Sequence, residues 1–180
     1  QVLKREALVI NNSALSFNRL MFVRRTASTG LPQNWQNITS IGDTACNDAL
    51  AVLDVTNLTV STFYAPSMSQ FLGYLNLHWN GDRLLFTGQA LTNGARPYTV
   101  FEIKSNGTGL KQVSPAAGSD IGWFDACYLP CGDMLMVSTA TFAGVPCVGG
   151  GDYVGNLYRV GTNGVVRQLT FDQDQNWGPT

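Results

Sequence analysis

Residues 132–137 read GDMLMV, a turn followed directly by an apolar strand. Residues 81–86 read GDRLLF and residues 18–23 read NRLMFV, so the same unit occurs three times. The spacing of about 50 to 65 residues is that of a four-stranded propeller blade with long loops. Because one such unit cannot bury its own apolar face, each needs a neighbour to pack against. The repeat therefore predicts a stack of sheets.

The third unit is the most regular. It predicts strands at residues 123–129, 134–139, 156–160 and 165–170. Between the last two strands, Asn163-Gly164 favours the pair of positive φ angles of a type I′ turn.

The other two units follow the same order. The second predicts strands at 71–77, 83–87, 98–104 and 110–114. The first predicts only the second to fourth strands of a unit, at 19–24, 50–55 and 60–64, with a long loop over residues 26–47.

These units predict an all-β chain that forms part of a β-propeller, with about three blades of four-stranded antiparallel sheets. We expect one domain over residues 1–180, with blades at about 1–66, 67–118 and 119–171. Residues 172–180 then begin a further blade, by analogy with Gly122-Trp123, since Trp177 occupies the repeat position of Trp123. Closed propellers usually have about four to eight blades. We therefore expect the chain to be part of a longer protein or a larger assembly.

The composition excludes several functional classes. Charged residues make up 13% of the chain and the net charge is −1, whereas a nucleic-acid-binding surface needs clustered Lys and Arg. No apolar run reaches the roughly 18 residues that predict a membrane span. Partners are therefore expected to be other domains or subunits, and neither nucleic acid nor a membrane span is expected.

Several segments resemble known repeats. Residues 106–113, NGTGLKQV, resemble the turn and strand of the TolB/WD40-like propeller repeats of bacterial envelope and secreted proteins. Residues 127–130, 144–147, 156–158 and 167–174 look more narrowly like the propeller (middle) domain of proteins grouped with the hydrazine synthase alpha subunit. In that enzyme the propeller lies between haem-bearing domains. The resemblance implies the propeller fold and a periplasmic or secreted location in a bacterium.

The resemblance does not extend to haem attachment. No Cys-x-x-Cys-His motif occurs in the chain, so haem c is not expected in this segment and would be bound elsewhere in the parent protein.

Blade topology suggests one disulfide. The start of a first strand and the loop between second and third strands lie on the same side of a blade, which places Cys127 near Cys147 and leaves Cys131 on the opposite side. The alternative is that these thiols are free.

Asp172, Asp174 and Asn176 alternate with other residues, as oxygen ligands do in a calcium loop. The glycine of such a loop is replaced by Trp177, which favours the alternative of an Asp-rich turn with carboxylates bonded to the backbone. Trp123 and Trp177 occupy equivalent repeat positions, so both are expected to pack between blades.

No catalytic residue is assigned. His78 has no Ser or Cys nearby in the sequence to act as a nucleophile, and Asp120, Asp125 and Asp133 stand where turns favour aspartate. The preferred function is a non-catalytic scaffold or interaction module of an exported protein. The alternative is the propeller segment of a multihaem redox enzyme, like hydrazine synthase, whose haems and active site lie outside this chain. A glycan- or peptide-processing enzyme with its site at the channel mouth is a third hypothesis.

Overall fold

The computed structural model describes residues 6, 9, 11–27, 46–90, 94–95, 97–116, 118–146, 149–150 and 152–180, with only the backbone given at 26–27. In this part of the chain the regular elements are β-strands, and there is no α-helix. None of its elements is a helix long and apolar enough to cross a membrane.

The strands form three antiparallel sheets, each following the chain from strand to neighbouring strand. The first sheet contains β1 (Arg19–Ala27), β3 (Cys46–Asp54) and β4 (Thr59–Tyr64). The second contains β5 (Gly73–Leu77), β6 (Arg83–Gln89), β7 (Tyr98–Lys104) and β8 (Lys111–Gln112). The third contains β9 (Trp123–Tyr128), β10 (Met134–Ser138), β11 (Asn156–Val160) and β12 (Val166–Gln168).

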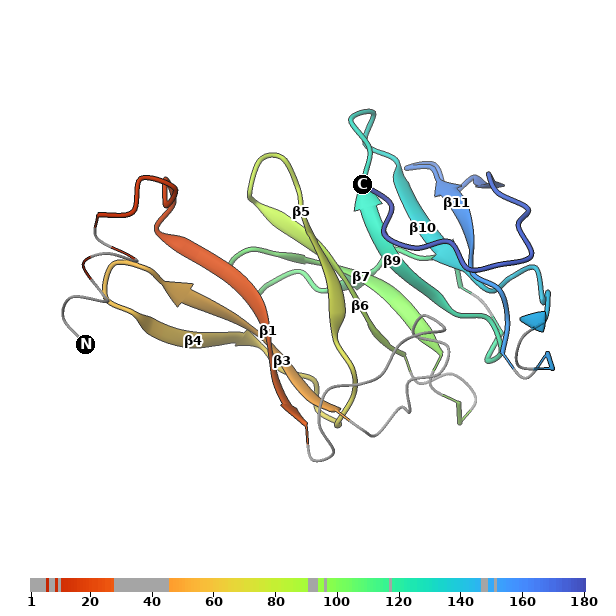
Figure 1. Ribbon diagram of the computed structural model, residues 1–180, viewed down its shortest axis with the longest axis horizontal. Coiled ribbons are helices and arrows are strands. Elements are labelled where there is room, and N and C mark those ends of the chain that lie inside the picture. Colours follow the sequence, from red (N-terminus) through yellow and green to blue (C-terminus); the bar gives the residue numbers. More distant parts are fainter. Residues whose placement is uncertain are drawn as a thin grey trace.

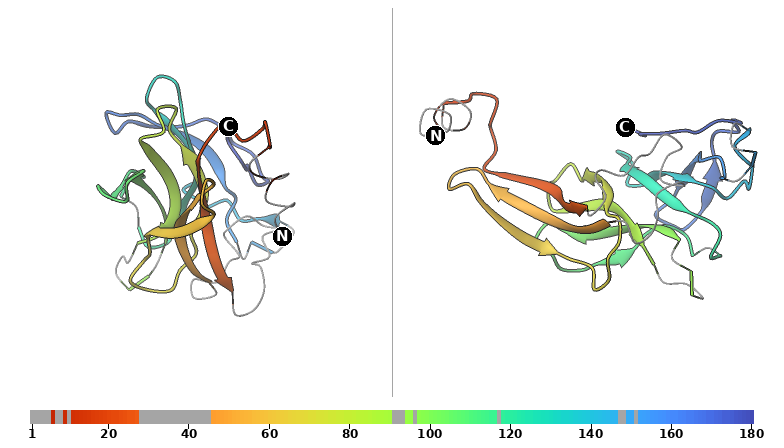
Figure 2. Two further views of the ribbon diagram at one scale, coloured as in Figure 1. Left: turned by 90° about the vertical axis from the view of Figure 1, so that its left-hand side faces the viewer. Right: turned by 60° about the horizontal axis from the view of Figure 1, so that its bottom comes forward.

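The three sheets stand side by side in chain order along the long axis of the molecule (Figure 1), and the right-hand view of Figure 2 shows the same succession. This arrangement confirms the all-β, partial-propeller prediction. The first sheet has three strands among the described residues, in the places expected for the second to fourth strands of a blade.

Several strand limits were predicted wrongly. β1 continues to Ala27 and β3 begins at Cys46, so the loop predicted over 26–47 is shorter; residues 28–45 lie outside the described residues. The pairing between β1 and β3 continues to these ends because Arg25 lies opposite Asp48 and pairs with it. In the second sheet β5 begins only at Gly73, and residues 71–72 precede it.

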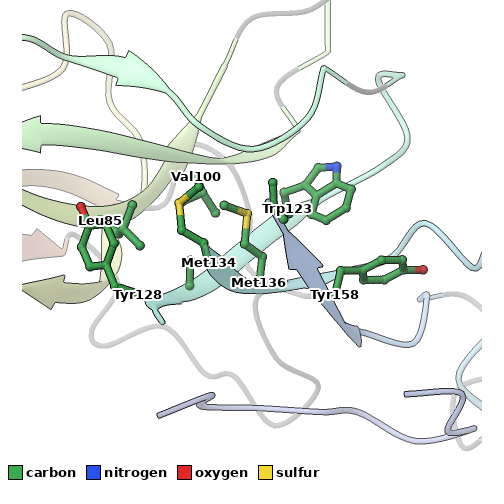
Figure 3. Close-up of a cluster of buried hydrophobic side chains, with 9 residues drawn as sticks. Leu85, Val100, Trp123, Tyr128, Met134, Met136 and Tyr158 are labelled. Carbon is green, nitrogen blue, oxygen red and sulfur yellow. The ribbon is translucent and has the colours of Figure 1, made fainter. Parts of the chain in front are cut away.

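Apolar side chains fill the space between the sheets from both sides. Between the first and second sheets they include Leu50, Leu72, Leu84, Phe86 and Ile103. Between the second and third sheets they include Leu85, Val100, Trp123, Met136 and Tyr158, which meet in one cluster (Figure 3). Successive residues of β6, Leu84 and Leu85, thus contribute to different clusters, as expected for a strand that is buried on both faces.

The first strand of each four-stranded sheet carries a bulge. The pairing of β5 with β6 shifts between Gly73 and Asn76, where Tyr74 has a φ of 52°. The pairing of β9 with β10 shifts in the same way, where Asp125 has a φ of 48°. A bulge leaves backbone groups without a partner in the ladder and redirects side chains. It makes the main chain here available to groups from the neighbouring sheet.

The type I′ turn predicted at Asn163-Gly164 is wrong. Only Gly164 has a positive φ, of 82°. Gly164 N–H donates to the carbonyl of Gly161 at 2.9 Å, and Gly161 N–H donates to the carbonyl of Val165 at 2.8 Å. This is a three-residue loop, in which a type I turn is followed by a glycine in the left-handed region.

Candidate functional site

The first and second sheets are joined by a buried carboxylate, that of Asp48. Arg25 Nε and Nη2 donate to it at 2.9 and 2.7 Å, and the N–H of Leu72 donates to it at 2.8 Å. Arg25 also donates to the Leu72 carbonyl at 3.0 Å, and its guanidinium lies 4.8 Å from the centre of the Phe71 ring. The hydrogen bond with Asp48 raises the pKa of Arg25. This ion pair determines where the chain enters the second sheet.

The second and third sheets are joined by comparable contacts. Thr87 Oγ1 accepts a hydrogen bond from the N–H of Asp125 at 3.0 Å, and Asn76 Oδ1 accepts one from the N–H of Tyr128 at 3.2 Å. At both junctions, therefore, a side-chain oxygen of one sheet accepts a main-chain N–H at or near the first strand of the next. These bonds satisfy backbone donors that the edge of a sheet leaves unpaired.

A polar groove of about 650 Å³ lies between the second and third sheets. Its lining includes Arg83, Glu102 and Lys111 of the second sheet, together with Tyr128 and Thr162 from the third-sheet region. Charged and hydrogen-bonding groups from distant parts of the chain thus converge on one concave surface, which makes this groove the candidate functional site.

Glu102 is the centre of the polar wall of the groove. It accepts a hydrogen bond from the hydroxyl of Tyr128 at 2.9 Å and forms ion pairs with Lys111 at 2.7 Å and Arg83 at 3.4 Å. Burial, and then the hydrogen bond to Glu102, raise the pKa of Tyr128, so this phenol stays protonated and acts as a donor. The His78 ring meets the Tyr128 ring edge to face, 4.8 Å between centres. The wall is held in place by these contacts and presents both signs of charge.

The C-terminal segment lies beside β9 (Figure 1). Gly155 N–H donates to Gln175 Oε1 at 2.7 Å, and Asn176 N–H donates to the Gly155 carbonyl at 2.9 Å. The N–H of Gly178 donates to the Asp125 carboxylate at 2.6 Å. Burial raises the pKa of Asp125, and the bond from Gly178 opposes that shift.

The predicted metal ligands form a hydrogen-bonded turn. Asn176 Nδ2 donates to Asp172 Oδ2 at 3.0 Å and to the Asp174 carbonyl at 3.3 Å, and Gln175 N–H donates to Asp174 Oδ1 at 2.8 Å. Over the described residues no three His, Cys, Asp or Glu side chains are grouped to hold a metal ion. Metal binding by Asp172, Asp174 and Asn176 stays a prediction.

The predicted disulfide involves a residue outside the described ones, Cys147. Cys127 is a buried free thiol on β9, opposite Leu135 of β10. Burial raises its pKa, which disfavours the thiolate. The Cys127–Cys147 pairing stays a prediction.

The two tryptophans expected between blades differ in surroundings. Trp123 is buried in the cluster between the second and third sheets, with its ring 5.3 Å from that of Tyr158. Trp177 is 53% exposed. A packing role for Trp177 needs a further surface against it and stays a prediction.

The structure does not gather the polar residues considered for catalysis into one site. His78 lies 3.5 Å from Asp82 and accepts a hydrogen bond from the N–H of Asn80. Asp125 holds Gly178, whereas Asp133 forms an ion pair with Arg159, which lowers the pKa of Asp133.

Sequence reasoning missed three residues of the inter-sheet contacts, Arg25, Asp48 and Glu102. For Asp48 and Glu102 the sequence did contain a signal of such a contact. Asp48 stands at the start of an apolar strand, and Glu102 lies between Phe101 and Ile103 in a strand with buried neighbours. A carboxylate in such a place needs a partner because its burial without one is costly. The sequence does not say which residue provides that partner.

A scan against known protein families finds no match, and no curated protein matches the sequence. Solved structures do match the fold. Hydrazine synthase from Kuenenia stuttgartiensis has a TM-score of 0.68 and 13% identity, over 91% of this chain and 26% of that chain. Puromycin hydrolase has a TM-score of 0.56 and 14% identity, over 90% of this chain and 22% of that one. Oligogalacturonate lyase in complex with manganese has a TM-score of 0.55 and 18% identity, over 85% and 38%.

These are β-propeller-type structures, so the propeller relationship expected from the sequence is confirmed at the level of the fold. The chain spans between 22% and 38% of the length of these three proteins. At such identities the similarity concerns architecture, and function has to be argued from the surfaces of this chain.

Proposed function

We propose that this chain is a non-catalytic β-propeller module that positions other domains or subunits of an exported bacterial protein. The observation that carries the proposal is the groove between the second and third sheets. It combines a volume of about 650 Å³ with a polar wall organised around Glu102. A groove of this kind suits a polar segment of a partner protein.

The rigidity of the wall supports this function. Tyr128 is held through its main chain by Asn76 and through its hydroxyl by Glu102. A surface whose side chains are already ordered loses little entropy when a partner binds. Lys111 is the accessible member of the wall, with 62% of its side chain exposed, so it is available to an incoming acceptor.

The test is a pull-down from the organism of origin, with partners identified by mass spectrometry. The variant Lys111→Glu reverses the charge in the groove, and the control Lys104→Glu changes an exposed lysine at the end of β7 that does not line it. We expect a partner that is captured by the wild type and by Lys104→Glu, and lost with Lys111→Glu. Equal capture by all three proteins would contradict a role for the groove.

A second candidate is the propeller segment of a multihaem redox enzyme like hydrazine synthase. It is favoured by the TM-score of 0.68 over 91% of this chain. The chain contains no haem-attachment motif, so its residues do not fit covalent haem, and the haems would have to be attached elsewhere. A Soret band in the natural parent protein would support this candidate, and an absorption spectrum without one would remove it.

The periplasmic or secreted location belongs to the same proposal. It is supported by the resemblance to repeats of bacterial envelope and secreted proteins. Fractionation of the source cells, followed by immunodetection of the natural protein, tests it.

A further inference from the structure

Equivalent residues of the second and third sheets make equivalent hydrogen bonds. The N–H of Val100 donates to Ser114 Oγ at 3.3 Å, and the N–H of Leu157 donates to Thr170 Oγ1 at 2.9 Å. Gln112 Nε2 donates to the Ser114 carbonyl at 3.2 Å, as Gln168 Nε2 does to the Thr170 carbonyl at 2.8 Å. These repeated bonds align the two sheets residue by residue.

The alignment identifies the residues of the third sheet that are equivalent in position to the second-sheet residues in contact with the third sheet. In the second sheet these contacts involve Leu85, Val100 and Val113, which pack in the cluster with the third sheet. Strand pairing makes their counterparts Leu135, Leu157 and Leu169. For Leu135 this differs by one residue from the alignment of the two sequence repeats, in which Leu84 matches Leu135.

The three counterpart leucines lie on the face of the third sheet that points away from the second, which we call the far face. Leu135 and Leu157 alternate with residues of the inter-sheet cluster and are half-buried. Leu169 is 42% exposed, and Phe171, two residues further, is 78% exposed. In the second sheet, the equivalent row of apolar side chains is the surface on which the third sheet packs.

One ion pair on the far face has its two charges exchanged relative to the second sheet, whereas the third charged position is a cation in both sheets. Arg83 and Glu102 of the second sheet correspond to Asp133 and Arg159 of the third. Arg83 and Glu102 form a salt bridge within the second sheet, and Asp133 and Arg159 form one within the third. Lys111 corresponds to Arg167, which forms no ion pair with any residue that the structure describes. Where the second sheet presents a carboxylate to the next sheet, the third presents guanidinium groups.

This reversal determines the chemistry of a complementary partner. In the second sheet Glu102 accepts a hydrogen bond from the hydroxyl of Tyr128, which comes from the first strand of the next sheet. At the equivalent place on the far face, Arg159 is 49% exposed and can only donate. The group that meets it must be an acceptor, and a carboxylate is the strongest one.

We propose that the far face binds the first strand of a further antiparallel sheet, and that this strand carries a carboxylate at the position equivalent to Tyr128. The path of the C-terminal segment supports this. After β12 the chain stays against the third sheet, because the Asp125 carboxylate accepts the N–H of Gly178. The proposal concerns a different surface from the groove and does not depend on it.

A second copy of this chain is the less suitable occupant. On the outer face of its first sheet β1 presents Arg24, which is exposed and lies on the side opposite to the Arg25–Asp48 pair. This arginine would bring a positive charge towards Arg159 and Arg167, and like charges across an interface are unfavourable.

The test uses two fluorescent peptides built on residues 122–129, the segment that contains β9. Both carry Cys127→Ser; one carries Tyr128→Glu and the other Tyr128→Gln. Their binding to the 180-residue protein is measured by fluorescence anisotropy. We expect the acidic peptide to bind about fivefold more tightly than its amide counterpart, the range for an ion pair of about 1 kcal/mol. The preference should disappear in Arg159→Gln, the variant that removes the proposed partner of the carboxylate, and binding of both peptides should weaken in Leu169→Ser.

Equal affinities for the two peptides, or no binding of either, would overturn the proposal. Self-association of the protein in analytical ultracentrifugation that is abolished by Leu169→Ser would assign the far face to a second copy, and would overturn it too. Lys111→Glu should bind the acidic peptide like the wild type, so that failure of the groove and failure of the far face can be told apart. Circular dichroism of each variant verifies that it is folded.

Discussion

At the scale of single residues, two carboxylates act where one sheet meets the next. Asp48 has a fully buried side chain, yet it is satisfied by Arg25 and by the backbone of Leu72. At the junction of the second and third sheets, Glu102 accepts a hydrogen bond from the Tyr128 hydroxyl. The attraction within a buried ion pair is largely offset by the cost of removing both charges from water, whereas removal of one partner destabilises the protein strongly. The two carboxylates therefore specify how the sheets fit together.

Asp48→Asn should destabilise the protein by about 3 kcal/mol, because it leaves the largely buried guanidinium of Arg25 without its counter-charge. The free energy of unfolding in urea measures this. The matched control is Asp82→Asn, at an exposed ion pair with Arg83, which should cost less than about 1 kcal/mol. A loss at Asp48 as small as that at Asp82 would show that the buried pair does not hold the first two sheets together.

At the scale of elements, short glycine turns and bulged first strands repeat from sheet to sheet. Gly107 closes the turn after β7 in the same way that Gly164 closes the turn after β11, with φ angles of 85° and 82°. The surroundings differ. A Cβ at Gly107 would lie 2.7 Å from the carbonyl oxygen of Phe63 in the first sheet, whereas a Cβ at Gly164 would meet nothing within 4 Å. The first turn therefore also belongs to an inter-sheet contact.

Alanine at these two glycines separates backbone strain from contact between sheets. Gly164→Ala should cost about 1 kcal/mol, the strain of a left-handed alanine. Gly107→Ala carries the same strain and adds a clash with a backbone atom, so we expect about 2 kcal/mol or more. Thermal unfolding of both variants measures the difference. Equal losses of stability in the two variants would mean that the turn at Gly107 can move away from β4 at no cost in free energy.

At the scale of the whole molecule, stability comes from the layers between the sheets. Each sheet is thin, and its apolar side chains are buried only because the next sheet covers them (Figure 3). The third sheet closes against the second through Trp123, Met136 and Tyr158. Loss of packing in such a layer is felt by both sheets that share it.

Met136→Ala should therefore destabilise the protein by about 2–5 kcal/mol, since Met136 is completely buried in the layer between the second and third sheets. Met68→Ala is the control: Met68 is 54% exposed, and its loss should change the free energy of unfolding by less than about 0.5 kcal/mol. Hydrogen exchange should show faster opening of β6 as well as β10 in Met136→Ala. Faster exchange confined to β10 would contradict the shared layer.

Much of the fold could be predicted because strands buried on both faces are apolar throughout and are separated by turn residues. The strands Tyr98–Lys104 and Asn156–Val160 have the limits that were predicted. Prediction failed where distant pairing decides the outcome. The extension of β3 to Cys46 depends on β1, and the turn at Gly164 depends on a three-residue loop geometry that the Asn-Gly pair does not specify.

For the residues that the structure describes, the sequence by itself determined the order and antiparallel succession of the strands, because turn chemistry and apolar runs are local properties of the chain. Only the tertiary structure decided which polar groups meet. Arg25 and Asp48 are 23 residues apart in the chain, and Tyr128 and Glu102 are 26 apart. Partners at such separations are selected when layers stack, since a charged group leaves water only where a complementary group from the adjoining sheet replaces it.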